Sequence, residues 1–418
     1  MLKEKLQKFW GNKNAKTVAS NFAWLSVLQI AGYIFPLITM PYLARVIGVD
    51  GFGKIAFAFA VMVWIQTIAD WGFNYTATRD VAQNRNNYKR ISEIFSNVLW
   101  ARCVLMLISF LFLMVLVVIF PKFRNNIDIL LISFLMIPGQ VLFPDWFFQA
   151  MERMKYITIL NVLSKLIFTI AVFVFIRNKE DYLLQPLFTS LGYLVSGLIA
   201  FYYILFKWKV KLQMPIVKNI CLTIKQSTDV FLNNLMPNLY NSFSMVLLGV
   251  IGGDIANGKL DAGTKFVNIA QQFMQVLSRA FFPFLSRKLD KHDIYARINI
   301  VLSLCMSILL FIFSPLLINI FFTEEFSDAV IVLRIMSISI LFLSLSNVYG
   351  TNYMILAGYE RQLRNVTSIV SIIGFVLSFP LIYYWNYIGA AITITLTRGI
   401  LGISIMFKAK MLKRKDEK

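Results

Sequence analysis

The chain has 418 residues, of which 58% are apolar and 15% aromatic, and only 15% carry a charge. A water-soluble domain carries about 25% charged residues, so this composition excludes a soluble globular protein. The formal net charge of +20 would suit a nucleic-acid-binding protein. However, the basic residues gather at the ends of apolar segments, as the positive-inside rule for membrane proteins requires. We therefore expect contact with anionic membrane lipids and no nucleic-acid partner.

Apolar segments recur along the whole chain, and each is long enough to cross about 30 Å of hydrocarbon. They predict an all-α integral membrane protein with about twelve transmembrane helices. The first, second, fourth, seventh, eighth and tenth segments are interrupted by proline or by many polar residues, so their hydropathy signal is weaker. The predicted spans are residues 17–45, 52–78, 93–120, 127–150, 156–176, 183–206, 227–251, 262–286, 296–322, 329–356, 364–385 and 387–407.

The distribution of basic residues predicts the orientation of these spans. With the N-terminus inside, the inner segments hold 28 Lys and Arg residues, whereas the outer loops and span ends hold 8. This asymmetry predicts that both termini are cytoplasmic.

Two halves of six spans are indicated by a basic midpoint and by weak internal repeats. Ile47-Gly48-Val49-Asp50 follows the first span, and Ile251-Gly252-Gly253-Asp254 follows the seventh. We expect an N-terminal six-helix bundle over residues 1–206, a cytoplasmic linker over 207–225 and a C-terminal six-helix bundle over 226–418. Because each half has an even number of spans, the repeats would be parallel.

The eighth span carries a ladder of polar residues at intervals of three and four, which places them on one helix face. A helix in lipid keeps such groups only where they face a protein interior or a water-filled cavity. The ladder consists of Lys265, Asn268, Gln272, Gln275 and Arg279.

Five basic side chains fall within predicted spans, at a cost that favours an inward orientation for most of them. For Arg102 and Arg334, which lie nearer a span end, snorkelling to the interface is an equal alternative. The other three are Lys165, Arg279 and Arg398.

Polar stripes also mark the second and seventh spans, at Gln66, Asp70 and Asn74 and at Asn234, Asn238 and Asn241. Interhelical hydrogen bonds are the alternative explanation for such residues, but stripes in equivalent spans of the two halves favour a shared cavity. Cationic groups in that cavity suit a phosphate or pyrophosphate ligand. The residues predicted to bind substrate are Lys265, Asn268, Gln272, Gln275, Arg279, Arg398, Lys165, Arg45, Asn234 and Asn238.

Two interior acids, Asp70 and Asp145, could pair with these bases or carry a coupling proton or sodium ion. Catalytic chemistry has little support. The single histidine, His292, lies in a charged segment and is expected to be solvated, and no Walker A loop, metal-spaced His/Cys set or nucleophile elbow is present. We therefore expect a protein that is not an enzyme and has no metal and no cofactor.

Three strings at the ends of the first, second and fourth spans resemble a known family. They are PYLARVIGVDGFG at 41–53, DWGFNYTATRDVA at 70–82 and FPDWFFQAMERMKYITI at 143–159. Together they resemble the polysaccharide-biosynthesis flippases, the O-antigen repeat-unit transporters. That family belongs to a larger exporter superfamily with the multidrug and toxin extrusion pumps and the peptidoglycan lipid flippases. Ala150 departs from the glycine often found there, which is a small-for-small change.

The resemblance implies two pseudo-symmetric six-helix bundles forming a V around a central cationic cavity. It implies a flippase that moves an undecaprenyl-pyrophosphate-linked oligosaccharide from the cytoplasmic to the periplasmic leaflet of the bacterial inner membrane by alternating access. It also implies an O-antigen polymerase and a chain-length regulator as partners. The arginines that bind pyrophosphate in the peptidoglycan-lipid branch are not transferred, because Gln66 occupies one of the corresponding positions.

Three alternatives remain open. A cation-coupled multidrug exporter of the same superfamily would have a more acidic and aromatic cavity than the interior bases indicate. A membrane-bound polysaccharide-processing enzyme would need a large extramembrane loop or a catalytic cluster. A structural scaffold would leave the interior charges unexplained.

Overall fold

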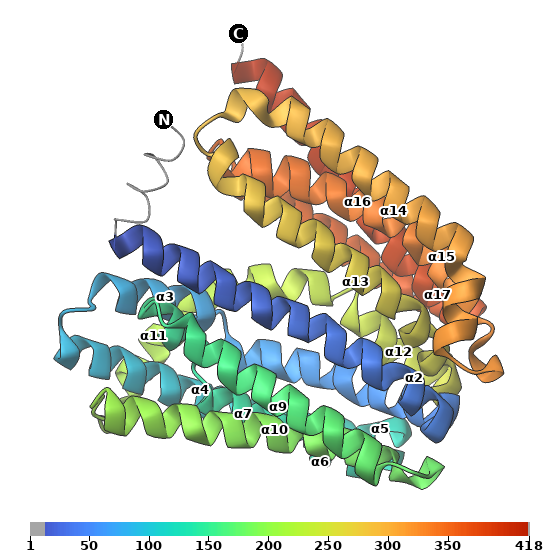
Figure 1. Cartoon of the computed structure of the whole chain (residues 1–418), viewed down its shortest axis with the longest axis horizontal. Helices are drawn as coiled ribbons and strands as arrows, with labels where there is room; N and C mark the ends of the chain where they lie inside the picture. Colours follow the sequence, from blue (N-terminus) through green and yellow to red (C-terminus); the bar gives the residue numbers. More distant parts are fainter. Residues whose placement is uncertain (1–12, 417–418) are drawn as a thin grey trace. The chain divides into compact units, whose positions relative to one another are not determined.

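The computed structural model describes residues 13–416. Residues 1–12 and 417–418, which include part of the basic ends predicted to be cytoplasmic, lie outside this range. Every regular element within it is a helix (Figure 1). The helices of the first half are α2 (Lys13–Asp70), α3 (Phe73–Gln83), α4 (Tyr88–Ile119), α5 (Pro121–Asn125), α6 (Ile127–Phe134), α7 (Met136–Leu142), α8 (Asp145–Ala150), α9 (Met154–Phe175), η1 (Lys179–Leu183), α10 (Leu184–Tyr202) and η2 (Tyr203–Lys207).

The second half follows an extended connection and contains both long helices and short irregular turns. Its helices are α11 (Val217–Asn238), α12 (Ser242–Ile251), α13 (Gly253–Leu285), η3 (Leu289–Lys291), α14 (His292–Phe321), η4 (Glu324–Phe326), α15 (Ala329–Ser337), α16 (Ser339–Leu345), η5 (Ser346–Ile355) and α17 (Glu360–Asp416). Two of the turns, η2 and η5, are π-helical.

Eight helical stretches of the described chain are long and apolar enough to cross a membrane. Two of them, Ala23–Gln83 and Glu360–Lys415, have 61 and 56 residues. At about 1.5 Å per residue, each is long enough for two crossings. Each also bends where the backbone leaves helical geometry, at Gly48 (φ 67°) and Asn386 (φ 51°). The prediction of an all-α membrane protein with multiple apolar spans is thus confirmed, whereas the count of about twelve stays a prediction.

The predicted seventh and eighth spans correspond to α11–α12 and α13, which are not among the eight apolar stretches of the described chain. Polar residues lower the mean hydropathy of these helices, which agrees with the weaker signal predicted for the seventh and eighth segments. The predicted fourth span, 127–150, is divided into α6, α7 and α8. This division follows the expected interruption by proline, because Pro144 occupies the position before α8.

Packing divides the chain into two compact units. Unit 1 consists of Met1–Tyr42 and Trp64–Leu232, and unit 2 of Leu43–Val63 and Asn233–Lys418. Each unit therefore contains a short segment from the other half of the sequence. These units group residues by contact rather than by chain order, and the domain limits inferred from the sequence stay a prediction.

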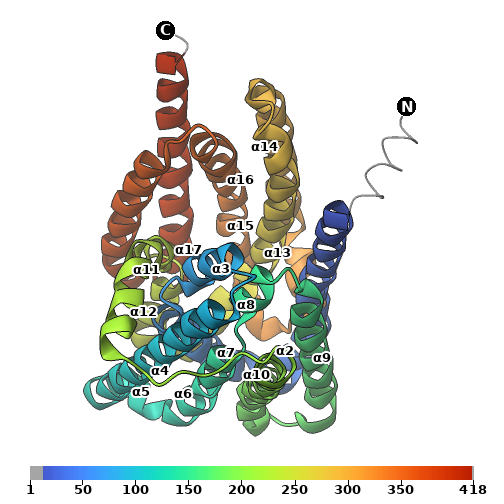
Figure 2. The same ribbon diagram turned by 90° about the vertical axis from the view of Figure 1, so that its left-hand side faces the viewer.

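In unit 1, α10 packs against α7 and α9, and α4 packs against α7 (Figures 1 and 2). An aromatic core lies around α8, which packs against α3 and α9. Trp146, Phe147 and Phe148 are fully buried there, and Phe95 of α4 packs against the first two. This core explains why the string DWFFQ, despite its charged first residue, forms a short buried helix.

In unit 2, α17 packs against α12, α15, α16 and η5, and α13 packs against α15. The segment 43–63 joins this unit through two reciprocal close approaches of backbone. A Cβ on Gly53 would lie 1.7 Å from the carbonyl oxygen of Asp254, and a Cβ on Gly258 would lie 2.4 Å from that of Val49. Only glycine permits such proximity. The two motifs that resembled a repeat in the sequence therefore lie against each other.

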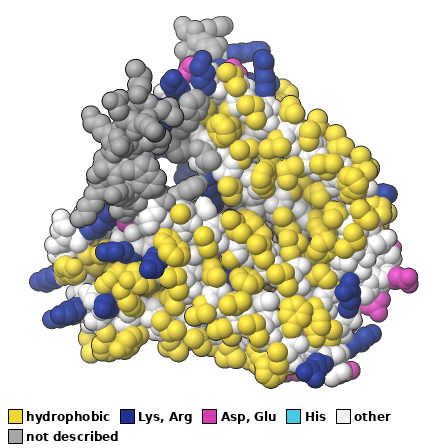
Figure 3. All heavy atoms as spheres, viewed as in Figure 1, with side chains coloured by type: hydrophobic (Ala, Val, Ile, Leu, Met, Phe, Trp, Pro, Cys, Tyr) yellow, Lys and Arg dark blue, Asp and Glu magenta, His cyan; other side chains and the backbone are white. Residues whose placement is uncertain are grey.

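Apolar side chains cover much of the molecular face shown in Figure 3. Outward-facing examples on α14 are 45–60% exposed: Ile298, Val301, Phe311, Ile312 and Leu316. A water-soluble protein rarely exposes so large an apolar patch, so this surface fits contact with lipid.

Candidate functional site

The polar ladder lies along α13 in unit 2, on the face opposite the helix's packed side. Asn268 and Arg279 are exposed, and Lys265, Gln272 and Gln275 are half-buried. On the packed side, Phe266, Val267, Ala270, Met274 and Ser278 are all buried. The predicted amphipathic helix is therefore present in the structure, with its polar residues left on the accessible side.

The two ends of the ladder differ in electrostatic environment. The Lys265 ammonium forms an ion pair of 2.8 Å with Asp261, one turn earlier, and lies 5.7 Å from the ring centre of Phe52. The exposed Arg279 has no carboxylate within ion-pair distance among the described residues. Arg279 is thus the ladder base without a carboxylate partner in the described part of the chain. Asp261 is a partner that the sequence reasoning missed, although its i,i+4 spacing from Lys265 could have indicated it.

Arg398 lies in the interior of unit 2 and is only 6% exposed. Its guanidinium donates hydrogen bonds to Ser339 Oγ and Asn241 Oδ1, both at 3.0 Å. Both partners are neutral, and no carboxylate in the described part of the chain pairs with this guanidinium. Arg334 is similar: its Nε donates to Ser314 Oγ at 3.1 Å, and its guanidinium lies 5.6 Å from the ring centre of Phe311.

The remaining basic and amide candidates lie apart from the ladder along the chain. Arg45 is exposed and donates to the carbonyl of Ile320 at 3.4 Å. Asn234 is exposed and Asn238 is half-buried in the last turn of α11. Lys165, in unit 1, is half-buried, and its ammonium lies 3.4 Å from where a Cβ on Gly32 would be.

Unit 1 contains a charged cluster at the end of α2. Arg102, on α4, is 3% exposed and forms an ion pair with Asp70. Asp145, the first residue of α8, lies within electrostatic range of both. Its Oδ1 accepts a hydrogen bond of 2.8 Å from the backbone N–H of Trp146. The cluster therefore holds two acids and one base. The sequence left open whether Arg102 snorkels to the interface or points inward. Its burial shows that it points inward.

The expectation for His292 is wrong. The imidazole is 2% exposed, and its Nε2 lies 2.9 Å from the carbonyl oxygen of Val348, to which it can donate. His292 is the first residue of α14 and turns inward under η5, even though its neighbours Lys291 and Asp293 are exposed. A run of charged residues predicts a solvated loop, and for this reason nothing in the sequence indicates that the His292 side chain points into the protein.

These features define a polytopic α-helical membrane protein with charged groups inside its helical units. A profile of the family described as "Polysaccharide biosynthesis protein" matches residues 18–289. The chain belongs to this polysaccharide biosynthesis protein family.

Two relatives carry the name "Putative O-antigen transporter". The protein from Escherichia coli (strain K12) is 29% identical over 406 residues, covering 95% of this chain and 98% of its own. The protein from Shigella dysenteriae is 27% identical over 396 residues, covering 93% of this chain and 99% of its own. Both alignments are essentially full length.

Solved structures share the fold at low sequence identity. The structure titled "Lipid II flippase MurJ, inward closed conformation" has a TM-score of 0.76 at 12% identity, covering 94% of this chain and 87% of that chain. The outward-facing structure of a multidrug resistance MATE family transporter of the MOP superfamily has a TM-score of 0.60 at 14% identity, covering 97% of each chain. The chain thus shares the fold of these two structures.

Proposed function

We propose that the protein is a flippase for an undecaprenyl-pyrophosphate-linked oligosaccharide, the O-antigen repeat unit. It would move this lipid from the cytoplasmic to the periplasmic leaflet of the bacterial inner membrane by alternating access, with both termini in the cytoplasm. Family membership and the names of the full-length relatives support this function. The V of two six-helix bundles around a cationic cavity belongs to the same proposal, as do a polymerase and a chain-length regulator as partners.

The observation that carries the proposal is the accessible polar face of α13. A helix used only for packing would have no need of Asn268 and Arg279 at exposed positions. The planar guanidinium of Arg279 can bind two phosphate oxygens at once, which a lysine cannot do. Asn268, Gln272 and Gln275 supply amide donors and acceptors on the same face, which suit sugar hydroxyl groups.

The cluster in unit 1 supports a role in ion coupling. Arg102 neutralises one carboxylate, so the second, Asp145, leaves the group with a net negative charge. A proton or a sodium ion would compensate this charge, and its release would change the balance of forces between α2, α4 and α8. A conformational equilibrium shifts only if the two states bind the ion with different affinities, and a cluster built from three helices can meet this requirement.

The test of the proposed function uses cells that depend on this protein for surface polysaccharide. We expect Arg279→Ala to abolish most polysaccharide display, Arg279→Lys to retain part of it, and Lys265→Ala to have a smaller effect because Asp261 already pairs with Lys265. Lys288→Ala, which removes an exposed base beyond the end of α13, is the control. Membrane abundance of each variant is measured by immunoblot. Normal display by Arg279→Ala at normal abundance would refute the assignment.

The drug-exporter alternative makes a different prediction. Expression of such an exporter would lower the sensitivity of cells to cationic drugs, and Asp145→Asn would remove that protection. A flippase should leave drug sensitivity unchanged in both cases.

A further inference from the structure

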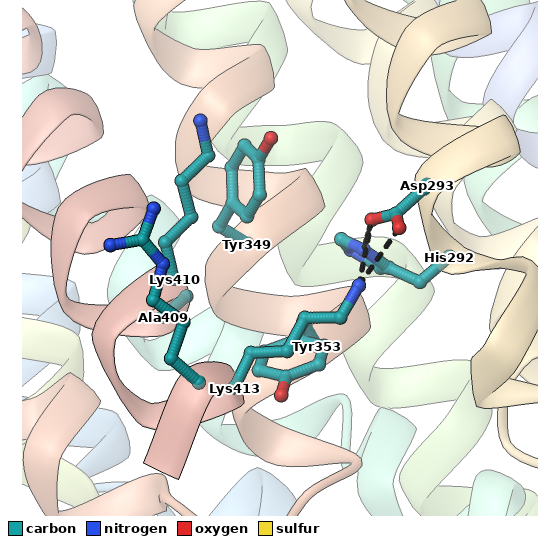
Figure 4. A pocket seen from close by; sticks show the side chains of 8 residues that line it. His292, Asp293, Tyr349, Tyr353, Ala409, Lys410 and Lys413 are labelled. Carbon is teal, nitrogen blue, oxygen red and sulfur yellow. Dashed lines mark hydrogen bonds and ion pairs between the residues drawn. The ribbon is translucent and has the colours of Figure 1, made fainter. Parts of the chain in front are cut away.

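A cationic pocket lies in unit 2, at the end of α17 and away from the α13 ladder in the sequence. Its volume is about 260 Å³. The lining side chains come from the start of α14, from η5 and from the last turns of α17 (Figure 4). They are His292, Asp293, Tyr349, Tyr353, Ala409, Lys410, Lys413 and Arg414.

The three bases of the pocket share one face of α17, because Lys413 and Arg414 follow Lys410 by three and four residues. Lys413 is held in place by Asp293, whose two carboxylate oxygens accept from its ammonium at 3.0 and 2.8 Å. Lys410 lies beside the ring of Tyr349, with its ammonium 5.9 Å from the ring centre (Figure 4). Lys410 and Arg414 have no carboxylate partner among the described residues. With three bases and one acid, the pocket carries excess positive charge.

The floor of the pocket is formed by the aromatic rings of Tyr349, Tyr353 and His292. Tyr349 and Tyr353 lie on the π-helix η5, a geometry that often occurs at functional sites. Their ring centres are 5.5 and 5.1 Å from that of His292. The bond between His292 and the Val348 carbonyl ties the start of α14 to η5. A positive-inside signal needs only basic residues. This arrangement adds a formed cavity, two tyrosine rings tilted against the His292 imidazole and a carboxylate that orients one base.

We propose that this pocket binds the phosphate group of an anionic phospholipid head group. Two unpaired bases provide the charge, and a cavity of about 260 Å³ admits a phosphodiester with part of its glycerol but falls below the roughly 300–1,000 Å³ typical of sites for larger ligands. The tyrosine rings can support the apolar part of the head group, as aromatic residues do at membrane interfaces. This inference does not rest on the proposed flippase activity, since the bases involved are not on the ladder.

The test uses the purified full-length protein in detergent, titrated with phosphatidylglycerol, phosphatidylethanolamine or inorganic phosphate. Bound lipid is counted by native mass spectrometry, and the melting temperature is measured in parallel. We expect phosphatidylglycerol to bind and to raise the melting temperature. The double variant Lys410→Gln/Arg414→Gln should weaken this binding roughly 30-fold. Each base near an anionic head group contributes about a fivefold gain in affinity, and the two factors multiply.

Two matched controls make the result specific. Lys408→Gln/Lys415→Gln removes the same charge from the same helix segment but leaves the pocket lining intact. Lys410→Arg/Arg414→Lys keeps the charge and should retain most of the binding. Because Lys410 and Arg414 are exposed, their substitution should not prevent folding.

Equal weakening in the Lys408/Lys415 control would show that only general surface charge attracts the lipid, and would overturn the proposal. Equal binding of phosphatidylethanolamine would also overturn it. If inorganic phosphate alone stabilises the protein as much as phosphatidylglycerol, and the lipid adds nothing, the ligand is a soluble anion and the lipid assignment is wrong.

Discussion

The two units surround their interior arginines with different groups. In unit 1, Arg102 is paired with Asp70, and Asp145 lies close enough to add a second negative charge. In unit 2, the half-buried Arg334 and the buried Arg398 contact hydroxyl, amide and aromatic groups, and no carboxylate among the described residues pairs with either. In a buried ion pair, the two charges neutralise each other within the protein. An arginine without an acidic partner can still attract an anion electrostatically. This difference underlies our proposal that unit 1 binds a proton or a cation and that unit 2 binds an anionic ligand.

The largest expected effect is on the stability of unit 1. Removing one partner of a buried ion pair leaves a charge unpaired, at a cost of about 3–5 kcal/mol. We expect Arg102→Met to lower the free energy of unfolding by this amount and Asp70→Asn to lower it by less, since Asp145 remains near Arg102. Thermal and denaturant unfolding in detergent measures both. A double variant, Arg102→Met with Asp70→Leu, should recover part of the loss, and a purely additive loss would argue against the pairing.

A second comparison concerns glycines, since the same substitution should behave differently in the two units. Gly53→Ala places a Cβ 1.7 Å from a backbone oxygen in unit 2 and should cost roughly 1–3 kcal/mol or more. Gly192→Ala in unit 1 meets Ser164 Cβ at 3.5 Å, an ordinary contact, and should be neutral or stabilising by up to about 1 kcal/mol. Melting temperatures of the two variants give the result. Equal stability would mean that residues 43–63 do not pack tightly in unit 2.

The uncompensated arginine of unit 2 should behave unlike Arg102. Arg398→Met removes a buried charge with no acid partner, which favours folding, but leaves the oxygens of Ser339 and Asn241 without their donor, which opposes it by about 1–3 kcal/mol. We expect a net change in the free energy of unfolding smaller than about 2 kcal/mol, together with a loss of transport. A loss of stability as large as that of Arg102→Met would remove the distinction between the units.

The smallest effect concerns an exposed ion pair outside the spans. Lys259 donates to Asp328 at 2.5 Å, and this hydrogen bond lowers the pKa of the Asp328 carboxyl. The stabilisation is therefore present above the ordinary pKa of aspartate, near 3.9, and is lost as the pH falls through the lowered value. Because Asp328 is 51% exposed, solvent screening limits the contribution to at most about 1 kcal/mol.

The corresponding measurement compares melting temperatures of wild type and Asp328→Asn at several pH values. At pH 7 the variant should melt at a slightly lower temperature than the wild type, and this difference should disappear at strongly acidic pH. A deficit that is independent of pH would show that the pair contributes through packing rather than charge.

Much of the architecture could be predicted from the sequence because it depends on local patterns. Apolar segment length predicted the helices, and the three-and-four spacing predicted the polar face of α13, which the structure contains. The interruption of span 127–150 followed from Pro138 and Pro144. These features depend on residues close together in the chain, for which helical periodicity is a direct guide.

Pairing across helices could not be predicted in this way. Asp70 and Arg102 are 32 residues apart, and nothing in the local pattern distinguishes Arg102 from a residue that snorkels. The burial of His292 depends on the π-helix η5, whose widened backbone has no signal in a single sequence. Arg398 looked like a ligand contact because it is a base in mid-span, but its partners Ser339 and Asn241 become evident only when three helices are packed.

The central claim is that Arg279, the accessible base on α13, binds the anionic group of a lipid-linked substrate during transport. The direct measurement is the rate at which purified protein in sealed vesicles moves a fluorescent undecaprenyl-pyrophosphate oligosaccharide between leaflets. Loss of a charged hydrogen bond worth about 1.5–3 kcal/mol predicts that Arg279→Ala slows this rate by roughly 10- to 100-fold, with the Lys288→Ala control unchanged. An Arg279→Ala protein that flips the lipid at the wild-type rate would contradict the account.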